Sequence, residues 1–258
     1  MKRLGAVFLG VLSTSCGTGL QDSNSVGRLY HYIRTNQDGS EPEHVWVYRR
    51  SLSEVEVLKE VEPCTRAAYV TAVLDLKRNQ PASLVGGKLR TDGSQEPFAF
   101  MNYAAEKREL SVRVPALKLD TQVRIEDEPW RIYDFDLADL TTLSAGHSPN
   151  NADFAFGMAL IWPSNQEKPL AYLGRVQATF QANEQRAGHN ALRFGVSGAL
   201  RGKLWLDAQE GHVLEAQFQE PNHSEYKDFQ LILQSSESHA ARRWHEVRLD
   251  HWRGCKEK

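Results

Sequence analysis

Residues 29–50 read LYHYIRTNQDGSEPEHVWVYRR, and they contain two strand-like runs on either side of a turn. Apolar and polar side chains alternate along residues 29–35 and again along residues 44–50, as they do in a strand with one buried face. Between the runs, Asp38-Gly39-Ser40 provides turn residues, because glycine accepts a positive φ and aspartate bonds to the backbone nearby. This stretch therefore predicts a β-hairpin.

The same pattern extends along most of the chain. Alternating runs are separated by turn residues, among them a second Asp-Gly-Ser sequence at residues 92–94 and a hairpin loop at residues 207–211. We expect the last strand at residues 244–252, and short helical segments only at residues 104–108 and 136–143. The sequence predicts a mainly β fold with few short helices, built as a large curved antiparallel sheet that forms an open or half barrel.

Residues 154–162, FAFGMALIW, differ from the other runs because both faces are apolar. Large side chains alternate with Ala155, Gly157 and Ala159, which is typical of a strand covered on both sides. One interpretation is a central strand of a packed core. The other is a curved sheet around an apolar cavity, with the small residues on the side that admits a ligand.

The first residues of the chain have the pattern of a secretory signal. Lys2 and Arg3 precede the apolar stretch LGAVFLGVL at residues 4–12, and small residues follow at 13–15. We expect residues 1–15 to be a signal peptide, residues 16–27 a tether, and residues 28–258 a single antiparallel β domain. Such a protein is exported into an oxidising compartment.

Cysteine usage suggests a lipid anchor. The sequence LSTSC at residues 12–16 resembles a lipobox, although its leucine lies four residues before the cysteine rather than three. The alternative is ordinary cleavage nearby, with Cys16 incidental. The chain has three cysteines, and a lipidated Cys16 would leave Cys64 and Cys255 to form a disulfide. Gly17 rather than an aspartate follows the cysteine, and in a lipoprotein of an enteric-type Gram-negative cell this resemblance implies the periplasmic side of the outer membrane. An unlipidated protein would be periplasmic or secreted.

Composition excludes some partners. The formal net charge of −2 becomes about −4 once Lys2 and Arg3 leave with the signal peptide, so we expect no nucleic-acid partner. The sequence contains no metal-ligand or cofactor motif that we recognise, and we expect no metal and no cofactor.

The acidic sequence DFDLAD at residues 134–139 does not match a calcium loop, so we interpret it as a solvated strand end. His223 and Glu225 follow Pro221, and we interpret them as part of a surface turn.

Candidate site residues gather around the first hairpin. His44 shares a strand face with Trp46 and Tyr48, and we expect Tyr30 or Tyr32 from the neighbouring strand to join them in a pocket. The predicted ligand-binding residues are therefore Tyr30, Tyr32, His44, Trp46 and Tyr48. A catalytic alternative uses the polar residues at the start of the second run, Glu41, Glu43 and His44.

Two parts of the sequence carry resemblances. Residues 30–44 and 251–255 resemble the beginning and the end of an uncharacterised family of exported bacterial β-proteins, and this resemblance implies no activity for the chain. The hairpin formed by residues 204–207 and 211–214 resembles strands of half-barrel envelope proteins such as the LolA and LolB lipoprotein carriers. That resemblance implies a curved antiparallel sheet.

These observations lead to three functional expectations. The first is a non-catalytic envelope lipoprotein that binds a lipid, another apolar or amphipathic molecule, or a further envelope component. The second is a periplasmic hydrolase with a site near Glu41, Glu43 and His44. The third is a structural protein without a ligand. An apolar cavity favours the first, convergent titratable groups favour the second, and a filled core favours the third.

Overall fold

The computed structural model describes residues 25–145, 150–162 and 168–256, which form a single large sheet. Its first eight strands are β1 (Leu29–Thr35), β2 (Glu43–Arg49), β3 (Glu54–Glu60), β4 (Ala68–Asp75), β5 (Gln80–Leu89), β6 (Gln95–Ala104), β7 (Glu109–Val114) and β8 (Leu119–Arg124). The predicted signal peptide, Cys16 and most of the tether lie outside the described residues.

The second part of the chain adds seven strands and two α-helices. The strands are β9 (Trp130–Ile132), β10 (Phe154–Ile161), β11 (Leu170–Arg186), β12 (His189–Gly198), β13 (Gly202–Asp207), β14 (Val213–Phe218) and β15 (Phe229–Glu237). The helices are α1 (Ala138–Ser144) and α2 (Ala241–Asp250), and the 3₁₀ turns are η2 (Pro115–Leu117) and η3 (Tyr133–Phe135). No helix in the described residues is long and apolar enough to cross a membrane.

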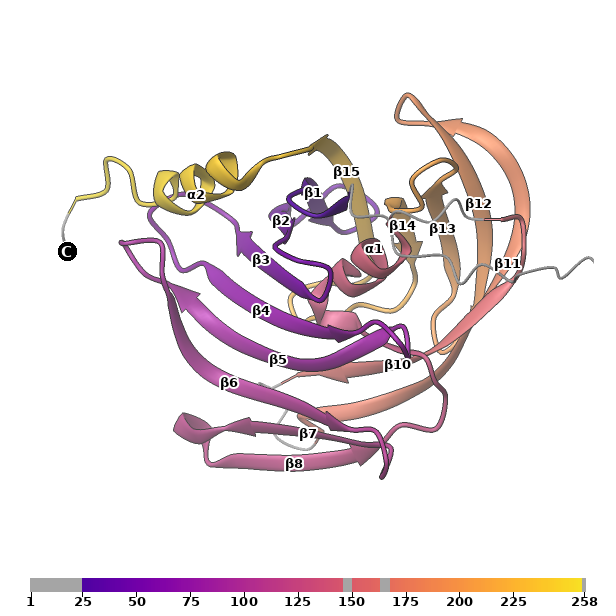
Figure 1. Ribbon diagram of the computed structural model, residues 1–258, viewed down its shortest axis with the longest axis horizontal. Coiled ribbons are helices and arrows are strands. Elements are labelled where there is room, and N and C mark those ends of the chain that lie inside the picture. Colours follow the sequence, from indigo (N-terminus) through magenta and orange to yellow (C-terminus); the bar gives the residue numbers. More distant parts are fainter. Residues whose placement is uncertain (1–24, 146–149, 163–167, 257–258) are drawn as a thin grey trace, which may run out of the picture.

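The sheet is almost entirely antiparallel, and it is not closed. Consecutive strands are neighbours in the 15-stranded sheet, except that β8 and β9 do not pair. In addition, β1 pairs with β15 and thereby joins the beginning of the domain to its end. Only β9 and β10 run parallel among the described strands. The edge strands are β8 and β9, and the curvature brings β8 close to β11 and β9 close to β5. The prediction of a large curved antiparallel sheet is confirmed (Figure 1).

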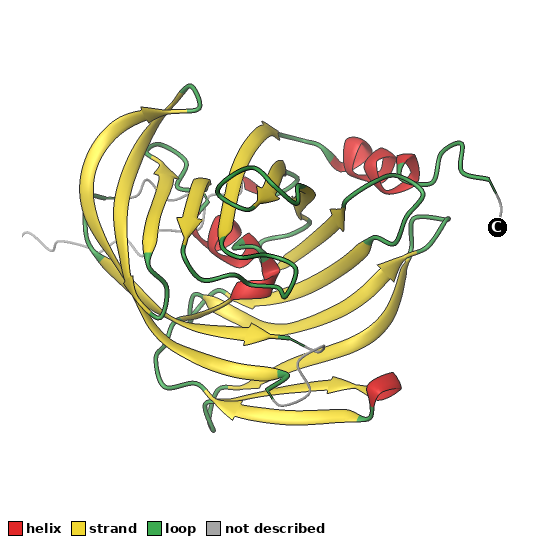
Figure 2. Cartoon of the chain, turned by 180° about the vertical axis from the view of Figure 1, so that it is seen from behind, coloured by secondary structure: helices red, strands yellow, loops and turns green. Residues whose placement is uncertain are grey.

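The concave face of the sheet encloses α1 and the main hydrophobic core. Leu140 and Leu143 of the helix pack with inward-facing strand residues such as Val57, Met101 and Phe218. Figure 2 shows the helix surrounded by strands. The short helix at residues 136–143 was predicted close to its observed position. Both faces of β10 are largely buried, as the apolar pattern of residues 154–162 indicated.

The convex face carries α2 and a second, smaller core. Trp244 and Val247 of the helix pack against outward-facing residues that include Leu58 and Tyr69. The prediction of a strand at residues 244–252 is therefore wrong. Trp244, Val247 and His251 are buried and lie three and four residues apart, which is the spacing of one helix face.

A disulfide between Cys64 and Cys255 fixes the end of α2 to the loop between β3 and β4. The two Cα atoms are 5.5 Å apart, within the range that a disulfide spans. The backbone N–H of Cys64 also donates a hydrogen bond to the carbonyl oxygen of His251 at 2.9 Å. The predicted pairing is confirmed, and it attaches a helix rather than a final strand to the first half of the sheet.

Candidate ligand-binding site

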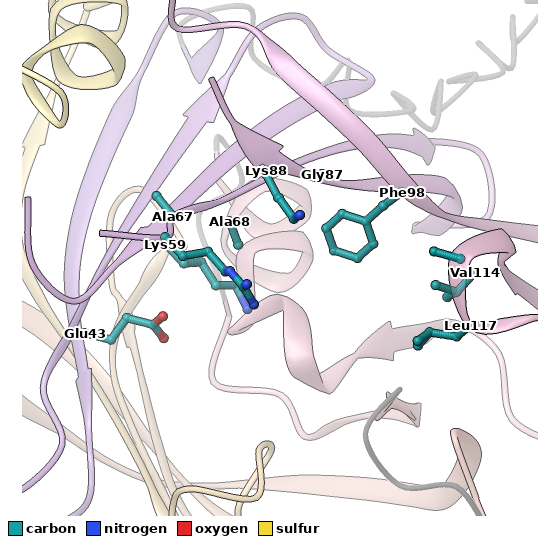
Figure 3. A pocket seen from close by; sticks show the side chains of 11 residues that line it. Glu43, Lys59, Ala67, Ala68, Gly87, Lys88, Phe98, Val114 and Leu117 are labelled. Carbon is teal, nitrogen blue, oxygen red and sulfur yellow. The ribbon is translucent and has the colours of Figure 1, made fainter. Parts of the chain in front are cut away.

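The concave face contains two adjoining pockets at the ends of β2 to β6. Their volumes are about 440 Å³ and 270 Å³, and five residues line both: Glu43, Lys59, Ala68, Gly87 and Phe98. The larger pocket extends over η2 to the rim, and the smaller one reaches inward to η3 and to the segment between β14 and β15. In Figure 3, Glu43 and Lys59 lie at one end of the larger pocket, and Phe98, Val114 and Leu117 lie at the other. We call this combined space the concave-face cavity.

Small residues leave the space open. Inward-facing positions on three successive strands are occupied by Ala68, Gly86 and Ala99. Gly86 pairs directly with Ala99, whereas Ala68 pairs with Lys88, two residues along β5 from Gly86. A Cβ atom on Gly86 would lie 3.3 Å from the Cβ atom of Ala99. Larger side chains at these positions would therefore fill the cavity, because the strands hold the backbones at a fixed separation.

A β-bulge directs Phe98 into the cavity. Gly86 pairs with Ala99 and Gly87 pairs with Pro97, so Phe98 is the extra residue of β6. At a bulge, the extra residue interrupts the regular alternation, so that two successive side chains need not point to opposite faces of the sheet. The ring of Phe98 points toward the space, and the residue remains 38 % exposed (Figure 3). An exposed phenyl ring at a cavity wall is a favourable surface for an apolar ligand.

A buried ionic cluster lies behind the charged end of the cavity, and Glu43 and Lys59 are its members that line the cavity. Lys59 Nζ lies 2.5 Å from Asp136 Oδ2, and Arg34 Nε lies 3.5 Å from Asp136 Oδ1. Arg34 Nη1 is also 3.8 Å from Glu43 Oε2, and its guanidinium carbon lies 3.1 Å from the centroid of the Tyr226 ring. The side chains of Arg34 and Asp136 are fully buried. Such a cluster is stable only when each charge keeps its partners.

Backbone geometry places Asp136 between the two cations. Asp136 and Leu137 both adopt left-handed conformations, with φ values of 50° and 58°, directly before α1. A left-handed non-glycine residue costs of order 1–3 kcal/mol and persists where its surroundings hold it. Here Asn222 helps to hold it, because Asn222 Nδ2 donates to Asp136 Oδ1 at 2.8 Å and to the Tyr133 carbonyl at 3.0 Å.

Several groups at or behind the cavity wall have shifted pKa values. Burial raises the pKa of Asp134 to about 7, although the charge of Lys59 opposes this shift. Burial also raises the pKa of Glu43 and lowers that of His223 to about 4. Burial opposes ionisation of Asp136 as well, but Lys59 and Arg34 hold its pKa below the usual range. The wall therefore combines a fixed ionic cluster with carboxyl groups that lose a proton less readily than in water.

The predicted ligand-binding residues lie on two different faces of the sheet. In the β1–β2 register, His31 is opposite Trp46 and Tyr30 is opposite Val47, so His44, Trp46 and Tyr48 face away from Tyr30 and Tyr32. Tyr30 and Tyr32 are buried in the main core, where the Tyr32 hydroxyl donates to the Val213 carbonyl at 2.9 Å. The expectation that these tyrosines accompany His44, Trp46 and Tyr48 is corrected by this pairing.

The other three predicted residues lie on the convex face near α2. Trp46 stacks on His31 with ring centroids 3.8 Å apart, and His31 Nε2 is 2.8 Å from His44 Nδ1. Tyr48 stacks on Trp244 of α2, with centroids 5.6 Å apart. None of the five predicted residues lines the concave-face cavity.

The residues of the predicted hydrolase site are also divided. Glu43 lines the cavity, whereas His44 is exposed on the opposite face, since neighbouring strand residues point in opposite directions. Glu41 is exposed in the turn before β2, where its φ is 55°. Of the three residues, Glu43 alone reaches the cavity.

Sequence analysis missed the other polar residues of the cavity wall. The sequence DFDLAD was interpreted as a solvated strand end, yet Asp136 and Asp139 are buried and Asp134 lines the cavity. His223 and Glu225, interpreted as a surface turn, also line it. The apolar residues within and beside DFDLAD, Leu137 and Tyr133 among them, were the available indication of burial.

No group of three or more His, Cys, Asp or Glu residues in the described ranges is arranged to hold a metal ion. Comparison with known proteins adds no assignment: no protein-family model matches the chain, and no curated protein matches it.

Proposed function

We propose that this protein is an exported envelope lipoprotein that binds an amphipathic ligand in its concave-face cavity and performs no catalysis on it. The observation that carries the proposal is the division of the cavity into an apolar side and a charged end. Phe98, Val114 and Leu117 form the apolar side. The charged end contains Glu43 and Lys59, and Arg66 and Lys88 add two further charged side chains to the lining of the same pocket. A molecule with an apolar body and a polar group matches this division.

The size of the cavity supports a ligand of lipid or drug-like dimensions. Small-molecule sites measure roughly 300–1,000 Å³ and combine an apolar lining with a few polar groups. Leu117 is 58 % exposed and Phe98 is 38 % exposed at the rim. Covering this surface would stabilise a complex by about 25 cal/mol for each Å² of apolar area removed from water.

The proposed location follows from the leader-like sequence. A lipid on Cys16 and the polar stretch at residues 21–27 would tether the domain to the periplasmic side of the outer membrane. The membrane would then be both the anchoring surface and a source of amphipathic ligands. Without the lipid, the same domain would act in the periplasm or outside the cell.

The two alternatives have weaker support. A hydrolase gains some support from Glu43, Asp134 and His223 at one cavity wall. However, no Ser, Thr or Cys is among the described residues that line either pocket, so an activated hydroxyl or thiol nucleophile has no candidate there. A structural protein without a ligand would not need the cavity, which small residues on three strands keep open.

Native mass spectrometry of the protein, extracted gently from its own cells, tests the proposal. We expect a co-purifying mass of lipid size that is lost under organic extraction. The matched comparison is an Ala99→Leu variant, whose larger side chain should occupy the cavity. Wild-type protein that carries no adduct, and that binds no acyl-chain probe when one is added, would contradict the proposal.

A further inference from the structure

We propose that the polar end of the ligand is an anion, a carboxylate or a phosphate attached to an acyl chain, and that Arg66 and Lys88 at the cavity rim bind it. This inference rests on the proposed function and adds the charge of the ligand. Both residues line the larger pocket, and the side chain of Lys88 extends toward it between Lys59 and Phe98 (Figure 3).

The sheet brings the two cations to the same side of the cavity. Ala68 of β4 pairs with Lys88 of β5, so both side chains point to the concave face. Arg66 precedes Ala68 by two residues and lines the same pocket. Arg66 and Lys88 thus line one pocket from adjoining chain segments, and we infer that a single anionic group reaches both.

The charges of Arg66 and Lys88 are not neutralised within the protein. Among the described residues, neither side chain takes part in an ion pair or a side-chain hydrogen bond, and both are exposed. Lys59 differs, because Asp136 lies 2.5 Å away and the Asp134 carbonyl accepts a further hydrogen bond from Nζ. The rim therefore offers two cations without an ionic partner among the described residues, while the charge of Lys59 at the floor of the cavity is already paired.

The acidic residues of the cavity do not cancel this surplus. Glu43 Oε2 lies 3.8 Å from Arg34 Nη1, and the positive charge of Arg34 partly neutralises that of the Glu43 carboxylate. Asp134 and Glu225 line only the smaller, inner pocket and not the rim. Arginine and lysine near an apolar wall are well suited to the head group of a fatty acid or an acyl phosphate, since arginine binds such oxyanions through two parallel hydrogen bonds.

Placement of the head group also sets the path of the chain. Phe98, Val114 and Leu117 lie across the larger pocket from Glu43 and Lys59 (Figure 3). From the rim, an acyl chain would run over Phe98 toward the inner apolar residues Leu84, Met101 and Val112. A neutral ligand of the same chain length would make these apolar contacts but would leave the two cations without a partner.

A binding series with the full mature chain tests the inference. The probes are hexadecanoate, hexadecyl phosphate and neutral hexadecanol, which share one chain length, and affinities are measured by displacement of a fluorescent apolar probe. We expect at least one anion to bind ten-fold or more tightly than the alcohol. Lys88→Glu and Arg66→Glu should each lower the affinity for that anion ten-fold or more and leave the affinity for hexadecanol unchanged. The relative affinities of the two anions separate a carboxylate preference from a phosphate preference.

The matched control is Lys203→Glu, which makes the same charge change on an exposed residue of β13 and should alter no affinity. Equal binding of all three probes, unaffected by the rim variants, would overturn the inference and leave the proposed function standing. If neither the anions nor hexadecanol bind, both proposals fail. Because Arg66 and Lys88 are exposed, their variants should unfold at the wild-type denaturant concentration, which excludes misfolding as the cause of a loss.

Discussion

Lys59 and Asp136 form a buried ion pair at the floor of the concave-face cavity, with 2.5 Å between Nζ and Oδ2. The pair joins β3 to the left-handed residue that precedes α1, and Arg34 approaches the same carboxylate from β1. Three separate parts of the chain therefore meet at one carboxyl group. This junction fixes both the position of α1 inside the sheet and the polar end of the cavity.

Removing the carboxylate should strongly destabilise the fold. In an Asp136→Asn variant, Lys59 and Arg34 would remain buried without their common counter-charge. Breaking a buried pair in this way typically costs about 3–5 kcal/mol, which urea unfolding can measure. Asp120→Asn, an equivalent change at an exposed position of β8, is the control and should alter the free energy of unfolding by less than about 0.5 kcal/mol. Similar stabilities of the two variants would show that the cluster is not needed for folding.

Filling the cavity should abolish binding while the fold is retained. Ala99→Leu places a larger side chain beside Gly86, and we expect the affinity for an acyl-chain probe to fall at least ten-fold. Overpacking should cost about 1–3 kcal/mol of stability. The comparison is Ser83→Leu, which adds an apolar side chain on the opposite face of β5, where Ser83 pairs with Val73. Undiminished binding by Ala99→Leu, with wild-type unfolding behaviour, would place the ligand elsewhere.

More of the fold than of the site could be predicted from the sequence, because strands and turns depend on neighbouring residues and the site depends on distant ones. Strand alternation and turn chemistry act over a few residues, so hairpins such as the one formed by β1 and β2 were recognisable in the sequence. The segment at residues 244–252 was ambiguous, because its apolar residues fit both a strand and a helix face. Its helical form depends on packing of Trp244 and Val247 against the convex face of the sheet. That contact joins residues far apart in the chain.

The cavity depends on relationships that no local pattern contains. It requires small residues on separate strands, such as Ala68, Gly86 and Ala99, to lie side by side, and it requires the bulge that directs Phe98 inward. The polar residues at the start of the second run, Glu41, Glu43 and His44, were a misleading indication, because alternation sends Glu43 to the cavity and His44 to the opposite face. Burial of Asp136 likewise follows from distant cations on β1 and β3.

His212 should make the protein less stable in mild acid. Burial lowers its pKa to about 4, with Asp207 and Glu210 opposing the shift and Arg28 and His189 adding to it. An unfolded histidine has a pKa near 6.5, so between about pH 6.5 and 4 the unfolded chain binds the additional proton. The free energy of unfolding should therefore fall as pH decreases through this window, by up to about 3 kcal/mol for this residue.

Comparison of variants isolates this contribution, because other groups titrate in the same window. The lowered pKa values of His31 and His223 act with the same sign, and the raised pKa values of Asp134 and Asp139 act with the opposite sign. Unfolding of His212→Gln should depend less steeply on pH between 6.5 and 4 than unfolding of the wild type. His245→Gln changes an exposed histidine on α2 and provides the reference. Parallel pH profiles for the wild type and His212→Gln would refute the assignment.

Reduction of the Cys64–Cys255 disulfide should loosen α2 and lower global stability. The bond closes a loop with a sequence separation of 191 residues. The chain-entropy model gives about 5 kcal/mol for a loop of this length, and measured values are commonly about 2–5 kcal/mol. We expect urea unfolding with and without reductant to differ by that amount, and amide exchange in residues 241–250 to increase. A Cys64→Ser, Cys255→Ser variant should show the same stability in both buffers. An oxidised wild type no more stable than the reduced form would contradict the expectation.

Cys16 is expected to carry a lipid in the mature protein. The disulfide uses two of the three cysteines in the sequence, and Cys16 follows a basic and apolar leader with small residues before it. Mass spectrometry of the N-terminal peptide should find the added mass of acyl chains, and the protein should partition with membranes. Cys16→Ser should shift it to the soluble fraction, whereas Ser15→Ala, which keeps a small residue before the cysteine, should leave it on the membrane. A soluble wild-type protein whose mature N-terminus lies at another residue would exclude lipidation at Cys16 and, with it, the proposed tether to the outer membrane.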